Sequence, residues 1–251
     1  MNTFRILSLC TLALAFTVSV KAQDEDRLPY STLSLRVGAA SISNKDEFQS
    51  PYTYRGINYR VSTSYENIRP RGRHVVTLDH TGGGIRSVVS PRAGNNLTLL
   101  NYDYFFGSGK KYADKKLAPL FGLGVHTLLS RTNYEPTVEQ SKTYLTGGVY
   151  AAVNTGLVYR LSKKISFELE ASLPLAGIVY RPDFEINGKT LQQTTLPGTN
   201  LLLSASAKFR YQVNEKVSFT VGYHHNYFTF DKPRPVTILQ QGLFIGMIAK
   251  F

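Results

Sequence analysis

The protein has a single cysteine and no tryptophan among its 251 residues. Cys10 lies in an apolar run near the N-terminus, so the rest of the chain can form no disulfide, cysteine-ligated metal site or cysteine nucleophile. After that first run, no apolar stretch reaches the roughly 20 residues that a transmembrane helix requires. A disulfide-stabilised scaffold and a bundle of transmembrane helices are therefore both excluded.

The N-terminal segment has the pattern of a secretory signal peptide. Arg5 precedes an apolar run from Ile6 to Val20, and Ala22 stands directly before the expected cleavage point. The run is too short for a spanning helix, which makes an uncleaved anchor the weaker alternative. We expect three parts: a signal peptide over 1–22, a short periplasmic segment over 23–30 and a single barrel domain over 31–251.

The expected domain alternates apolar and polar residues with a period of two. The clearest runs are LSLRVGA (33–39), GVYAAVNTGLVYRL (148–161), ISFELEASL (165–173), LLLSASAKFRY (201–211) and VSFTVGYHHNY (217–227). Helical spacing does not fit these runs, whereas alternation over more than four residues predicts strands. Their length of about 10 to 14 residues exceeds that of most soluble strands and suits a strand that crosses a membrane.

The pattern predicts an all-β protein, a single transmembrane antiparallel up-and-down β-barrel. Ten strands are expected at about 31–41, 55–66, 73–81, 96–106, 117–128, 145–161, 165–177, 200–211, 217–228 and 239–251. Short periplasmic turns alternate with longer extracellular loops, such as 129–143 and 178–199. The pattern does not define clear strand boundaries over residues 69–94, so eight or twelve strands are the alternatives to ten. Within this segment, TGGGIR (81–86) is predicted to be a flexible turn.

The last residues carry the sharpest pattern in the sequence. Leu243, Ile245, Met247, Ala249 and Phe251 form an apolar series at every second position that ends on an aromatic residue. In this tail and in its alternation, the chain resembles the superfamily of bacterial outer-membrane β-barrels, among them the small OmpA-like and porin-like barrels. The resemblance implies a multi-pass barrel in the outer membrane of a Gram-negative bacterium, surrounded by outer-membrane lipids. It also implies that these five residues form the insertion signal that the barrel assembly machinery reads.

Without the expected signal peptide, which carries Arg5 and Lys21, the net charge falls from +12 to +10, and most of it lies at one rim of the expected barrel. The expected periplasmic turns hold Arg69, Arg71, Arg73, Lys110, Lys111, Lys115, Lys116, Lys163, Lys164 and Lys216. A basic rim suits anionic phospholipid headgroups, and a solvated surface explains it equally well. No basic stripe with interleaved aromatic residues is present, so we expect no nucleic-acid partner.

The inward-facing positions of the middle strands predict a cluster of charges inside the barrel. Its expected members are Arg160, Glu168, Glu170, Lys208 and Arg210, with Arg36, Arg60, Glu66 and Asp103 nearby on other strands. Buried charges must be paired, and side chains largely fill the interior of small barrels. We therefore predict a plugged polar lumen, with a selective channel lining as the alternative.

No set of residues has the pattern of an active site. Asp79 and His80 fall on opposite faces of a strand, which weakens an acid–base dyad. Three further histidines lack an obvious nucleophile: His126, His224 and His225. Ser130 is the one candidate hydroxyl that we consider for the first of them in a hydrolase arrangement. We assign no catalytic residue, metal or cofactor.

Three functions remain in order of preference. The first is a structural or surface-interaction barrel, with an unidentified surface or periplasmic protein as partner. The second is a narrow porin-like channel for small solutes, which conductance in planar bilayers would reveal. The third is an outer-membrane protease or lipid-A-modifying enzyme acting at the rim, whose activity a His→Ala substitution would abolish.

Overall fold

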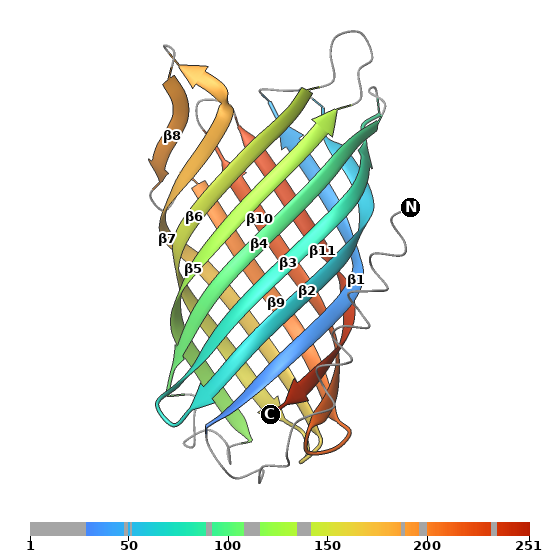
Figure 1. The fold of residues 1–251 in the computed structure, drawn as a ribbon, viewed down its shortest axis with the longest axis vertical. Coiled ribbons are helices and arrows are strands. Elements are labelled where there is room, and N and C mark those ends of the chain that lie inside the picture. Colours follow the sequence, from blue (N-terminus) through green and yellow to red (C-terminus); the bar gives the residue numbers. More distant parts are fainter. Residues whose placement is uncertain are drawn as a thin grey trace.

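The computed structural model describes residues 29–47, 50, 52–88, 92–107, 116–134, 142–186, 189–195, 200–231 and 235–251. The expected signal peptide and almost all of the expected periplasmic segment lie outside the described residues. Within this part of the chain every element is a β-strand, and the strands wrap into a tall cylinder with a marked tilt (Figure 1). The same residues include no helix with the length and hydropathy that crossing a membrane demands.

Ten strands close the cylinder, each antiparallel to its neighbours. They are β1 (Tyr30–Asp46), β2 (Tyr54–Arg69), β3 (Gly72–Arg86), β4 (Arg92–Phe106), β5 (Leu117–Tyr134), β6 (Lys142–Arg160), β7 (Ile165–Ile186), β9 (Asn200–Gln212), β10 (Val217–Phe230) and β11 (Val236–Lys250). β11 pairs with β1 along its whole length and closes the ring. We call the end where β1 begins and β11 ends the inner end, and the opposite end the outer end.

The ten-strand, up-and-down barrel is confirmed, and the alternatives of eight and twelve strands are wrong. Both expected loops are too long, because 129–134 and 142–143 are strand and so is much of 178–199. β7 continues to Ile186, and the short strand β8 (Lys189–Thr195) pairs with the outer part of β7. The two form a hairpin that stands above the ring at the outer end (Figure 1).

The segment TGGGIR, expected as a flexible turn, lies inside β3. Gly82, Gly83 and Gly84 pair with β4, because the hydrogen bonds of a sheet join backbones and need no side chain. Gly83 has a φ of +156°, a conformation that glycine adopts without a steric penalty. The glycines therefore mark an irregular stretch of strand and not its end.

Side chains alternate between the outside and the lumen as predicted. In β1, Leu33 and Val37 are exposed on the outside, whereas Ser34 and Arg36 are buried within. All ten ring strands place large apolar residues on the outer surface: Leu33, Tyr59, Leu78, Leu100, Leu123, Val149, Leu173, Phe209, Val221 and Leu243. This surface is suited to hydrocarbon, as the outer face of a membrane barrel must be.

The outer half of the lumen holds large apolar clusters beside buried polar residues, so the predicted polar lumen is polar only in part. Inward side chains from seven strands form what we call the apolar plug: Leu97, Leu99, Leu128, Tyr150, Val179, Leu202, Phe228, Phe230, Val236 and Ile238. The other three strands, together with Ala93 of β4, add a smaller cluster that contains Ile42, Tyr54 and Ile85. Several of these residues lie beyond the ends of the predicted strands, so the sequence pattern did not assign them to the lumen.

Candidate functional site in the barrel lumen

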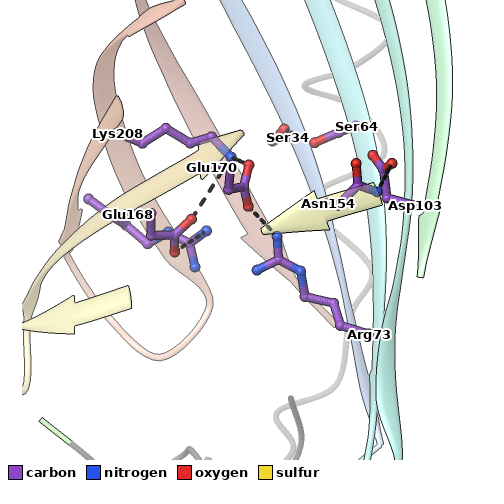
Figure 2. A network of polar contacts seen from close by, with 9 residues as sticks. Ser34, Ser64, Arg73, Asp103, Asn154, Glu168, Glu170 and Lys208 are labelled. Atoms are coloured by element: carbon purple, nitrogen blue, oxygen red, sulfur yellow. Dashed lines mark hydrogen bonds and ion pairs between the residues drawn. The ribbon is translucent and has the colours of Figure 1, made fainter. Parts of the chain in front are cut away.

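A network of ion pairs occupies the inner half of the lumen, and the register of two strands creates it. Glu168 of β7 lies opposite Lys208 of β9, with Glu170 and Arg210 on the same inward face. Lys208 contacts Glu170 and reaches within 4.0 Å of a Glu168 oxygen, while Arg210 Nη2 donates to Glu168 Oε1 over 3.2 Å. Figure 2 shows the two carboxylates side by side between their cations.

Arg73 completes this network, although the sequence suggested a periplasmic turn for it. The turn comprises residues 70 and 71, so β3 already begins at Gly72 and Arg73 faces inward. Its Nη2 lies 2.5 Å from Glu170 Oε1, and its side chain is 8% exposed (Figure 2). We define the ion network as Arg73, Glu168, Glu170, Lys208 and Arg210. Arg73 lies two positions before Val75 on the same face of the strand, and this spacing could have predicted that Arg73 points into the lumen.

Arg160 is the one expected cluster member that stands apart. It lies opposite Ser166, as the turn between β6 and β7 predicted. It is the last residue of β6, however, and its side chain is exposed at the inner rim. Among the described residues it forms no ion pair with the network, because β9 brings its own two cations to the same carboxylates.

Charges of both signs face the lumen. Among the described side chains they include Arg36, Arg60, Arg73, Arg181, Lys208 and Arg210 as well as Asp46, Glu66, Asp79, Asp103, Glu168 and Glu170. The residues expected nearby (Arg36, Arg60, Glu66 and Asp103) are all among them. An interior that excludes water requires such charges to be paired, because an unpaired buried charge is very costly.

A second polar chain runs through β4, β5, β6 and β7. His126 Nε2 lies 2.7 Å from Asp103 Oδ1, which also accepts from Asn154 Nδ2 over 2.6 Å. Ser172 Oγ lies 3.3 Å from His126 Nδ1, so this serine, and not Ser130, is its hydroxyl partner. The order of acid, imidazole and hydroxyl resembles that of a hydrolase triad. It faces an internal cavity of about 120 Å³, where a peptide or lipid has no room.

Polar contacts also cross the lumen between strands that are not neighbours. Arg181 Nη2 of β7 donates to both carboxylate oxygens of Asp46 of β1, each over 2.8 Å. Asn44 of β1 donates to Thr132 of β5 over 3.0 Å, and Gln240 of β11 contacts Thr81 of β3. Together with Arg73 and Glu170, these contacts tie opposite walls at several heights.

The histidines do not form a site at the outer rim. All five lie within strands, and Asp79 and His80 point to opposite faces as expected. Asp79 pairs with Arg60 inside, whereas His80 bonds Thr98 over 3.0 Å on the outside. Within the described residues no group of three or more acidic, histidine or cysteine side chains is arranged to hold a metal ion.

The expected insertion signal lies on the outer face of the closing strand. Leu243 and Ile245 are strongly exposed, Phe251 is partly so, and the intervening Phe244 and Ile248 are buried in the lumen. The backbone of Phe251 exchanges two hydrogen bonds of 2.9 Å with Ser31, at the seam between the first and last strands. Recognition of this tail by an assembly machinery stays a prediction.

Known proteins share the fold and not the sequence. No protein-family model and no curated protein match the chain. The outer membrane protease OmpT of Escherichia coli superposes with a TM-score of 0.66 at 9% identity, over 94% of this chain and 100% of that one. The translocator domain of the autotransporter NalP from Neisseria meningitidis has a TM-score of 0.47 at 8% identity, over 98% of this chain and 95% of that one. Neisserial surface protein A has a TM-score of 0.34 at 11% identity, over 87% of this chain and 97% of that one.

These findings define the class of the protein. A closed antiparallel ring with an apolar outer surface, folded like a known outer-membrane barrel, is an integral β-barrel of the Gram-negative outer membrane. At 9% identity the likeness to OmpT concerns the fold alone.

Proposed function

We propose that the protein is a sealed outer-membrane barrel with a structural or surface-interaction role and no conducting pore. The observation that carries the proposal is the apolar plug. Its ten side chains are each at most 3% exposed, and they come from seven of the ten ring strands. An ion that crossed this layer would have to shed its hydration shell among side chains that, apart from the Tyr150 hydroxyl, offer no polar replacement.

The contacts that cross the lumen support the same function. Arg181 with Asp46 and Asn44 with Thr132 join opposite walls, so the lumen is bridged as well as filled. At the outer end, the hairpin of β7 and β8 projects beyond the ring (Figure 1). Among the described strands β8 pairs with β7 alone, so its other edge offers backbone groups to a protein partner outside the membrane, which suits an interaction role.

Conductance in planar phosphatidylcholine bilayers tests this proposal. The wild-type protein should leave the current at the background of the lipid alone. Tyr150 and Phe228, whose rings are 6.4 Å apart in the plug, provide a matched opening variant. Truncation of both to alanine removes two of the largest plug side chains and should raise the leak of small ions. Discrete single-channel steps from the wild-type protein would overturn the sealed barrel and support the narrow pore.

A further inference from the structure

Three buried basic side chains gather around one aromatic ring in the lumen. The guanidinium carbons of Arg36 and Arg60 lie 5.6 and 5.2 Å from the centre of the Phe244 ring. The His224 ring centre lies 6.4 Å from the same point. All three basic groups are at most 9% exposed, and all three line the internal cavity of about 120 Å³.

Glycines on the closing strands make room for this arrangement. Phe244 of β11 lies opposite Gly38 of β1 and Gly222 of β10. A Cβ atom at Gly222 would stand 2.5 Å from Phe244 Cζ, and one at Gly246 would stand 2.5 Å from Arg36 Cγ. Side chains at these positions would displace the ring and the arginine from the wall. The inward glycines of the tail therefore shape the cavity.

The cluster holds more hydrogen-bond donors than the protein supplies acceptors for. Arg60 is paired with Asp79, whereas Arg36 forms no ion pair among the described residues. Arg36 Nε and Arg60 Nε and Nη1 are buried without a protein hydrogen-bond partner, and the neutral imidazole of His224 adds one N–H donor beside them. Two guanidinium groups thus share one carboxylate, and buried donors left in this condition are costly.

The other acidic side chains that line the cavity interact with basic groups or hydrogen-bond donors other than Arg36. Glu170 is held by Arg73 and Lys208, and Glu66 lies among the same cations. Asp103, on the opposite wall, accepts from its neighbours in the second polar chain. Asp79 keeps one oxygen without a protein partner, and water in the cavity can donate to it. The excess positive charge therefore remains at Arg36.

We propose that the cavity binds a small monovalent anion, such as chloride, between Arg36, Arg60 and His224. An anion is purely an acceptor and so complements a wall made of donors. A cavity of about 120 Å³ accommodates a halide with a few water molecules. The inference rests on the sealed lumen proposed above, because an open pore would let bulk water solvate the same groups.

The test measures urea unfolding rates in phosphatidylcholine vesicles, in chloride and in gluconate at equal ionic strength. Gluconate is a much larger anion than chloride and is not expected to replace it at the site, so wild-type protein should unfold about tenfold more slowly in near-saturating chloride. Arg36→Met, which keeps an apolar stem against Phe244, should abolish the difference. The matched control Arg160→Met, which removes an exposed arginine, should retain it. Bromide should also give an anomalous diffraction peak beside Arg36.

A second expectation separates an anion site from a structural arginine. In gluconate, Arg36→Met should unfold no faster than the wild type, because it removes a buried charge that has no partner. His224→Phe provides an independent variant, with a reduced response to chloride. Equal wild-type rates in the two salts, or a chloride response that survives Arg36→Met, would overturn the proposal. If the wild-type protein conducts ions in bilayers and its slower unfolding in chloride still depends on Arg36, only the proposal of a sealed lumen is refuted.

Discussion

Removing the two acids of the ion network is the most direct perturbation of the lumen. Glu170 bridges Arg73 and Lys208, and Glu168 pairs with Arg210. The double substitution Glu168→Gln with Glu170→Gln keeps the shape of both side chains and deletes both negative charges. Three cations then remain together in the inner half of the barrel without the carboxylates that they contact.

The expected loss of stability follows from the burial of each acid. Losing one partner of a buried ion pair costs about 3–5 kcal/mol. Glu170 is 20% exposed beside a cavity that can hold water, which places its loss near the lower limit, at about 3 kcal/mol. Glu168 is 5% exposed and adds a similar amount, but both acids contact Lys208, so the two losses overlap by about 1 kcal/mol. The double variant should lose about 5 kcal/mol of unfolding free energy.

The assay must not depend on tryptophan, which the protein lacks. Urea unfolding in phosphatidylcholine vesicles can be followed by far-ultraviolet circular dichroism and by the heat-modifiable shift on gels. Arg160→Gln is the matched control, because it removes an exposed charge at the rim and should change stability by no more than about 0.5 kcal/mol. A double variant as stable as this control, with a new preference for anions in conductance, would refute the buried network.

Two further predictions concern the wall of the barrel. Deleting Phe251 should lower the yield of assembled protein in the outer membrane, because the residue pairs with Ser31 at the seam and ends the expected insertion signal; full yield of heat-modifiable protein would contradict this. Leu203→Arg should cost roughly 2–4 kcal/mol of unfolding free energy, since it places a charge on the lipid face. Ser204 lines the cavity, so Ser204→Arg should cost less unfolding free energy than Leu203→Arg. If urea titrations show the larger loss for Ser204→Arg, the lipid and lumen faces assigned to this strand are reversed.

Local alternation was sufficient to predict the wall. A period of two identifies a strand, and the same period assigns each side chain to the lipid or the lumen. Hence Leu33, Arg36 and Glu168 lie on the expected faces. Pairing beside a tight connection is equally local: Tyr159 lies opposite Phe167 because the short turn between β6 and β7 determines which residues face each other.

Contacts across the lumen could not be predicted in this way. Which inward residues of β3 and β7 meet depends on the width of the ring and on the stagger of its strands, and neither is a property of one strand. Arg73 and Glu170 are 97 positions apart, and Asp46 and Arg181 are 135 apart. The ends of the strands were also predicted poorly. Stopping β10 at residue 228 left Phe230, a plug residue, outside the predicted strand.

The plug and the ion network depend on each other. Packed apolar side chains close the outer half, so water can approach the charges below chiefly from the inner end. Electrostatic interactions strengthen as water is excluded, and the same exclusion makes each unpaired group more costly. The charges beneath such a plug must therefore be closely paired, as Glu168 and Glu170 are with Arg73, Lys208 and Arg210. Arg36 has no such carboxylate of its own, which is why an anion is expected there and not at Arg181, which pairs with Asp46.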